Sequence, residues 1–170
     1  MRERCSPVRA SLEAHLGSQQ VARVVYGAII GLALIVVLED HPPSAGVTTA
    51  WLLMTALAVG LAEAYSEVVG TETSERHRVT RHQLRHILED AGAVALGVGL
   101  PVVFFLLAVA DVIRLDTAFS VAKWSGLGLI GFYGYWAARF AGASMSRALV
   151  QGAVVAAIGG ALILFKALVH

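Results

Sequence analysis

Charge is scarce in this chain: only 15% of its 170 residues are Asp, Glu, Lys or Arg, while 57% are hydrophobic. The charged residues are also grouped in short segments, with long apolar runs between them. A soluble domain normally carries more charge than this, whereas a polytopic helical membrane protein shows this segregation. The composition therefore predicts an all-α membrane protein, with the lipid bilayer as its main surroundings.

The chain also lacks features on which several other classes depend. The single cysteine, Cys5, excludes an intramolecular disulfide and a cysteine metal cluster. With a net charge of +1 and no basic stripe, we expect no nucleic-acid partner. Residues 1–20 contain no apolar stretch, so we expect no cleavable signal peptide and interpret them as a cytoplasmic segment. Asparagine is absent and arginine far outnumbers lysine, which we interpret as the bias of a GC-rich bacterial genome and hence of a bacterial plasma membrane.

Five apolar segments approach or reach the length that crosses a bilayer as a helix, about 20 residues. They predict that residues 21–170 form one transmembrane domain of five helices, at about 21–38, 50–69, 91–110, 117–138 and 148–165. In the first segment, Gly27 and Gly31 have a spacing that lets two helix backbones approach closely. Pro101 lies in the middle of the third segment and is expected to kink it. The polar residues 71–90 are predicted to form a cytoplasmic connector helix.

The basic residues predict the orientation, because Lys and Arg are enriched in cytoplasmic loops. Ten of the 13 basic residues fall before or at the start of the first segment, between the second and third, or between the fourth and fifth. The other side of the membrane would have three. We therefore expect the N-terminus in the cytoplasm and the C-terminus outside.

The second apolar segment contains two carboxylates, Glu63 and Glu67, that lie on one helix face because they are four residues apart. A carboxylate in hydrocarbon costs about 2.5–3.5 kcal/mol and usually faces a bundle interior or a cavity. Two stacked carboxylates in a low dielectric do not both ionise readily, so one must hold a proton, meet a cation or reach water. We interpret the pair as ligands for a metal ion and a proton. The alternative is that Glu67 is hydrated at the membrane surface.

A second, weaker group of candidate metal ligands lies in residues 71–90. His82 and His86 are four residues apart, and Glu75 and Glu89 fall on the same side of the predicted helix. Imidazole and carboxylate groups suit iron, manganese, zinc or cobalt. Two arginines share that stripe and would repel a metal, so a solvated, salt-bridged helix is the favoured interpretation.

No motif for catalysis accompanies these residues. The stretch His82–His86 has the outline of the zinc-protease HExxH pattern, but Gln83 replaces the glutamate base. We find no serine nucleophile elbow, phosphate-binding loop or EF-hand spacing. We therefore expect that the chain is not an enzyme and holds no permanently bound cofactor.

Three stretches of the sequence resemble, in the same order along the chain, motifs of a known protein family. They are YGAIIG at 26–31, AEAYSEVVG at 62–70 and ALGVGLPVVFFLLA at 95–108. They resemble the Gly-Ala-Asn-Asp-Gly, Met-Ala-x-Gly-Glu-Tyr and Ala-x-Gly-x-x-x-Pro motifs of the first three spans of the vacuolar iron transporter family. In this alignment Glu67 falls on the family's glutamate and Glu63 on its methionine. The resemblance covers about residues 21–168.

The resemblance implies a homodimer in which paired first and second spans enclose a path for ferrous or manganous ions, exchanged for protons. Gly27 and Gly31 would then lie at the two-fold axis. This chain departs from the family at Ile30, which replaces the first-span aspartate, and it lacks the long cytoplasmic helices rich in Glu and Met. We expect a proton-coupled divalent metal transporter. The alternatives are a non-transporting membrane scaffold or partner subunit, and a proton or cation channel.

Overall fold

The computed structural model describes residues 19–169, so the predicted cytoplasmic segment 1–20 lies almost wholly outside the described part of the chain. Within that part every regular element is an α-helix and no strand occurs, as the all-α prediction requires. The helices are α2 (Gln19–Leu38), α3 (Ala45–Glu75), α4 (Arg81–Gly99), α5 (Val102–Val109), α6 (Leu115–Phe140) and α7 (Met145–Val169).

Two of these helices, α2 and α3, are long and apolar enough to cross a membrane on their own. The pair α4 and α5 makes a third candidate if the two are counted as one bent span. A shorter apolar helix, Met145–Ala161, lies within α7. The fold is therefore that of a helical membrane protein with two or three candidate spans, while five spans and their orientation remain predictions.

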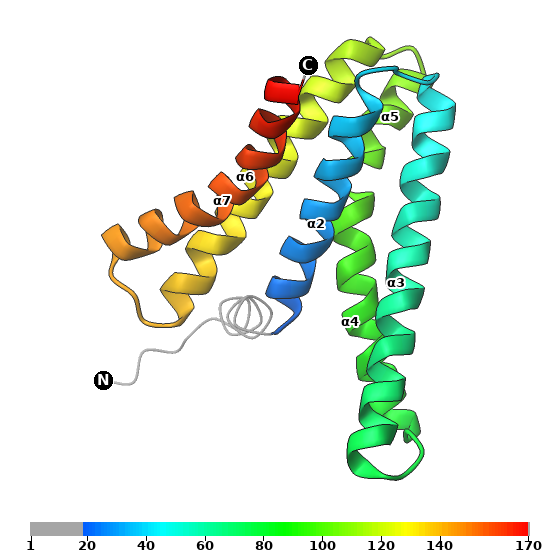
Figure 1. Ribbon diagram of the computed structural model, residues 1–170, viewed down its shortest axis with the longest axis vertical. Helices are drawn as coiled ribbons and strands as arrows, with labels where there is room; N and C mark the ends of the chain where they lie inside the picture. Colours follow the sequence, from blue (N-terminus) through cyan, green and yellow to red (C-terminus); the bar gives the residue numbers. More distant parts are fainter. Residues whose placement is uncertain (1–18, 170) are drawn as a thin grey trace, which may run out of the picture.

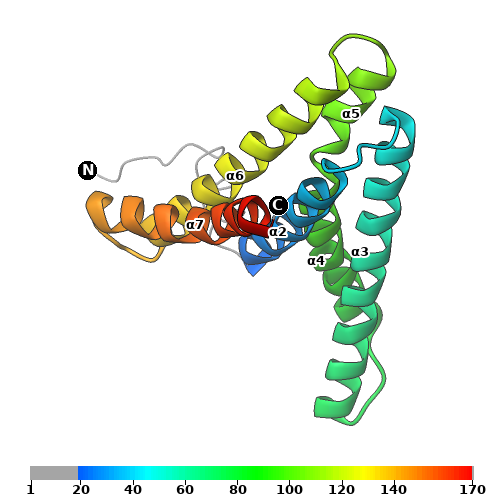
Figure 2. The same cartoon turned by 45° about the horizontal axis from the view of Figure 1, so that its top comes forward.

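Helix α2 lies at the centre of the bundle, packed against α4 on one side and α6 on the other (Figure 1). The pair α3–α4 and helix α6 come together near α5 and diverge toward their other ends, and α7 packs along α6 (Figures 1 and 2). We call the end with the α3–α4 turn the hairpin end, and the opposite end the α5 end. The aromatic core lies at the α5 end, where Phe105 and Phe119 pack edge to face with ring centroids 4.9 Å apart.

Residues 71–90 do not form one connector helix, which corrects the prediction made from their polarity. Helix α3 continues to Glu75, and Arg76 then adopts a left-handed conformation with φ of 54°. Helix α4 begins at Arg81, where the side chain of Thr80 caps its first turn. The sequence between the helices contains no glycine or proline to mark the break. The polar stretch is therefore the tip of a hairpin made of two helix ends.

The third apolar segment is bent by 48° where α4 meets α5. Pro101 lies at this break and has no N–H, so regular helical hydrogen bonding is interrupted there. The chain resumes with a tighter turn in which the N–H of Phe104 donates to the oxygen of Pro101 over 3.0 Å. The kink expected at Pro101 is present, and it directs α5 onto α3 and α6.

Helices α2 and α4 touch backbone to backbone at Gly27 and Gly31. A Cβ atom on Gly31 would lie 3.0 Å from the oxygen of Val98, and one on Gly27 would overlap the oxygen of Val94. Gly97 fits from the other side against the α2 backbone. Helix α4 of the same chain, and not a second copy, therefore covers this glycine face, which corrects the placement of these glycines at a dimer axis.

Candidate functional site

Four charged side chains meet near the hairpin end of α2, where this helix lies against α3 and α4. The guanidinium of Arg23 contacts a carboxylate oxygen of each of three acids, at 2.6 Å for Glu63, 3.0 Å for Glu67 and 3.3 Å for Asp90. All four side chains are partly buried, with relative exposures of 16% for the arginine and 29%, 38% and 21% for the acids in the same order. We call these four residues the Arg23 cluster.

The register of the helices explains why these residues meet. The close contacts of Gly27 with Val94 and of Gly31 with Val98 show that α2 and α4 run parallel with matching steps. One helical turn before the first of these contacts, Arg23 therefore lies opposite Asp90. Glu63 and Glu67 are one turn apart on α3, so both point to the same side and reach the same guanidinium.

The charges of the Arg23 cluster do not balance. One guanidinium faces three carboxylates, so the cluster has two more negative than positive charges when all four groups are ionised. Arginine suits this position because its planar fork offers separate N–H groups to different carboxylates, and here Nη1 donates to Glu63 while Nη2 donates to Glu67. Partial burial makes the remaining excess of negative charge costly.

The length of α3 can be compared with the thickness of a bilayer to estimate how deep the Arg23 cluster would lie. Its 31 residues span roughly 46 Å, which exceeds the roughly 30 Å of a hydrocarbon core. Counted from Ala45, Glu63 lies roughly 27 Å and Glu67 roughly 33 Å along the helix axis. With Ala45 taken as one edge of the hydrocarbon core, the acids would fall near its other edge, at the hairpin end, and closer to it than a helix beginning at residue 50 would put them. Their partial exposure fits this depth.

The sequence led us to expect a positive charge beside Glu63 and Glu67, and the guanidinium of Arg23 supplies one. Among the described residues, no group of three His, Cys, Asp or Glu side chains is arranged to hold a metal as it stands. Sequence reasoning counted Arg23 with the cytoplasmic charges and overlooked Asp90. The available signal was that Arg23 is the one charged residue inside the first apolar segment.

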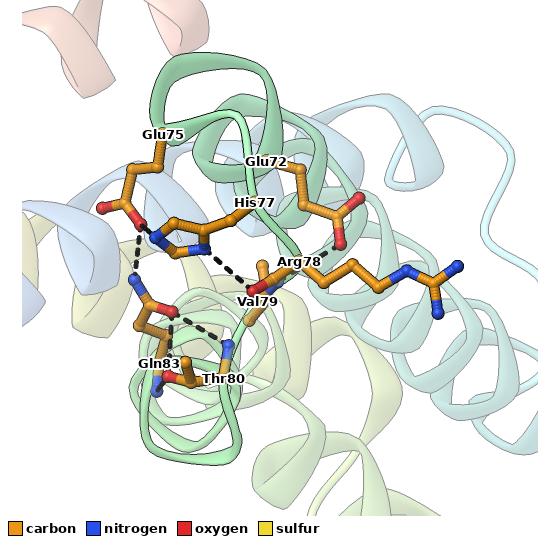
Figure 3. A network of polar contacts seen from close by, with 7 residues as sticks. All are labelled: Glu72, Glu75, His77, Arg78, Val79, Thr80 and Gln83. Carbon is orange, nitrogen blue, oxygen red and sulfur yellow. Dashed lines mark hydrogen bonds and ion pairs between the residues drawn. The ribbon is translucent and has the colours of Figure 1, made fainter.

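The weaker candidate ligands lie on the hairpin, where other partners engage them. The Oε2 atom of Glu75 accepts a hydrogen bond of 2.8 Å from Gln83 and lies 3.0 Å from Nε2 of His77 (Figure 3). The other ring nitrogen of His77 lies 3.0 Å from the backbone oxygen of Arg78 (Figure 3). Thr80 and Gln83 complete a capping box at the start of α4. Glu75 thus takes part in closing the turn.

The remaining three weaker candidates lie on the exposed face of α4. The rings of His82 and His86 pack edge to face with centroids 4.6 Å apart. Glu89 receives a hydrogen bond of 2.9 Å from Arg85 and lies 3.6 Å from His86. These contacts are those of a solvated, salt-bridged helix, the interpretation that the sequence favoured.

The α5 end has a different arrangement. The ammonium of Lys123 lies 2.6 and 2.7 Å from the two oxygens of Glu39, again with both side chains partly buried. A cavity of about 780 Å³ opens beside this pair. Asp116 lies at its rim, where a hydrogen bond from the backbone N–H of Thr117 and then the guanidinium of Arg114 lower the pKa of its carboxyl group.

Comparison with known proteins gives no match to a family model, to a curated protein or to a solved structure. The resemblance to the vacuolar iron transporter family therefore remains a prediction from three short sequence motifs. The Arg23 cluster and its position in the helix bundle are the features of the structure that bear on function.

Proposed function

We propose that this chain is a membrane transporter that exchanges a divalent metal ion, ferrous iron or manganese, for protons at the carboxylates of Glu63, Glu67 and Asp90. The observation that supports this proposal most is the charge imbalance of the Arg23 cluster, which lacks two positive charges when its acids are ionised. One divalent cation or two protons would supply that charge. Exchange between the two is therefore the chemistry for which the cluster is suited.

The chemistry of the donor atoms agrees with such a cargo. Carboxylate oxygens suit manganese and ferrous ions, and they bind them only when deprotonated. Metal binding at these acids would therefore release protons, and protonation would release the metal. The acids come from two helices, α3 and α4, so a shift of one helix against the other would change how many oxygens reach the ion.

A homodimer, which the sequence resemblance implies, would need another face than the glycine face of α2. The outward side of α3 is available in the described structure and is strongly apolar. Its large exposed side chains are Trp51, Leu53, Met54, Leu57, Leu61 and Tyr65. We propose that this face contacts lipid in the monomer and packs against a second copy in the homodimer.

A second function, a non-transporting scaffold or partner subunit, is favoured by one observation. Arg23 already pairs with all three acids, and in this reading it simply binds α2 to α3 and α4. A cation channel using the same acids would conduct ions without exchanging protons. These alternatives differ in ion movement, which can be measured directly.

The test is uptake of Mn²⁺ into proteoliposomes that enclose a pH-sensitive dye. The proposed transporter should move protons against the metal, and Glu67→Gln should reduce the initial rate at least tenfold because it removes a charged ligand. Glu72→Gln is the matched control, since it changes the same residue type on the same helix at the exposed hairpin tip, where the amide oxygen can still accept the hydrogen bond from the N–H of Val79. Metal flux without proton movement would favour a channel, and no flux in the wild type would favour the scaffold.

A further inference from the structure

We propose that Arg23 is a tethered competing cation: its guanidinium occupies the cargo's place in the resting protein and must withdraw before a metal can bind. This inference rests on the proposed function and names how that site is regulated. The charged group that the metal would have to displace belongs to the protein itself, one helical turn before the close contact at Gly27.

The distances support competition for the same oxygens. The three carboxylates direct one oxygen each at guanidinium nitrogens, at 2.6 to 3.3 Å. A metal ion would need several oxygens at about 2.0–2.6 Å from a single point, which the guanidinium prevents while it lies among them. The metal site therefore forms only when Arg23 leaves.

The position of Arg23 allows its side chain to withdraw from the three acids. It belongs to the second turn of α2, near the membrane boundary, and its side chain keeps 16% of its surface exposed. A partly exposed arginine can extend its head group toward the interface while its methylene groups stay on the apolar surface. A change of side-chain rotamer is then enough to uncover the acids, without unfolding of a helix.

A built-in monovalent competitor would also make the site selective. Sodium or potassium has the same charge as the guanidinium but cannot form its directional hydrogen bonds to several carboxylates, so it should not displace Arg23. A divalent ion offers twice the charge and can do so. The arginine would thus exclude monovalent ions, and it would lower the affinity for the cargo enough to allow release.

The test measures Mn²⁺ binding to the purified full-length protein by the electron paramagnetic resonance signal of free Mn²⁺, with no transport step. Arg23→Gln should lower the Kd for Mn²⁺ at least tenfold, and 100 mM potassium should compete in this variant but not in the wild type. Arg85→Gln is the matched control, because that arginine is exposed on α4 and pairs with Glu89 away from the Arg23 cluster. It should bind like the wild type.

Arg23→Lys keeps the inference falsifiable if the glutamine variant does not fold. An ammonium cannot bridge the carboxylates as the planar guanidinium does, so its Kd should fall a few-fold below that of the wild type. A Kd equal to or above the wild-type value in Arg23→Lys, or in a folded Arg23→Gln, would overturn the competing role and leave the transporter proposal intact. Absence of Mn²⁺ binding in the wild type and both variants would instead overturn the proposed cargo.

Discussion

The two ends of the bundle pair their partly buried charges differently. At the α5 end, one ammonium of Lys123 faces both oxygens of one carboxylate, Glu39. At the hairpin end, the single guanidinium of Arg23 faces three carboxylates. The side chains are similarly buried, with exposures of 20% and 31% for the first pair and 16% to 38% in the Arg23 cluster. Burial therefore does not distinguish the two sites, but charge balance does.

This difference separates an ion pair whose charges balance from a cluster whose charges do not. A partly buried pair of opposite charges needs nothing further, and removing either partner leaves the other uncompensated. A cluster with excess negative charge is stabilised by a divalent cation or by protons that supply the missing positive charge. The Lys123–Glu39 pair thus has the character of a structural contact, and the Arg23 cluster that of a site whose occupancy can change.

The largest expected effect comes from separating α2 from α4. Gly27→Ala places a methyl group against the backbone oxygen of Val94, which cannot move without shifting α4. Overpacking of this kind costs about 1–3 kcal/mol or more, and here it should also pull Arg23 out of reach of Asp90. We expect a clearly lowered melting temperature in detergent and altered Mn²⁺ binding.

Gly128→Ala is the control for that experiment. Gly128 lies on α6 with nothing within 4 Å of an added Cβ, so alanine there should keep or slightly raise stability by its better helix propensity. Equal melting temperatures for Gly27→Ala and the wild type would contradict the close α2–α4 contact. The Lys123–Glu39 pair lies at the other end and should keep its contribution in both variants.

A direct comparison of the two ends comes from neutralising one acid at each. Glu39→Gln leaves the ammonium of Lys123 partly buried without its carboxylate, and we expect a loss of about 1–3 kcal/mol, below the range for fully buried pairs because both groups retain exposure. Glu67→Gln removes one of three carboxylates around Arg23 and relieves like-charge repulsion. Its effect on stability should stay within about 0.5 kcal/mol of zero, or be stabilising.

Chemical unfolding of both variants in the same detergent measures this asymmetry. If Glu67→Gln were as destabilising as Glu39→Gln, the acids of the Arg23 cluster would be structural like Glu39. This result would favour the hypothesis of a non-transporting scaffold. High salt should weaken whatever difference is found, because neither site is fully shielded from solvent.

Much of the fold follows from the sequence because it depends on composition and spacing. The helical class, the kink at Pro101 and the closeness of a helix to Gly27 and Gly31 are properties of single segments. The hairpin break was missed because Arg76 takes a left-handed conformation that is uncommon for arginine. The dimer-axis placement of the glycines was wrong because spacing shows that a partner approaches but not which helix it is.

For a related reason, the sequence predicted Glu63 and Glu67 as site residues but not Arg23 and Asp90. Glu63 and Glu67 stand out because they are charges in an apolar segment of their own. Asp90 stands at the edge of a polar stretch, and only the α2–α4 register brings it opposite Arg23. Arg23 itself satisfies the positive-charge rule for cytoplasmic segments, which hid its pairing with the acids. Contacts between helices depend on register, and single-segment patterns do not contain that information.

The smallest expected effect concerns Asp116, at the α5 end. The hydrogen bond from the N–H of Thr117 and the nearby Arg114 favour its ionised form, so its pKa is lower in the folded than in the unfolded state. A lowered carboxyl pKa adds stability above the unfolded value of about 3.8, and this contribution disappears as pH falls through the folded pKa. Asp116→Asn should therefore melt slightly below the wild type at pH 6, and the difference should shrink as the pH falls below about 3.8. Melting curves of both proteins across this range provide the measurement. A difference that persisted unchanged at low pH would show that the shape of the side chain at the start of α6, and not its charge, stabilises this end of the bundle.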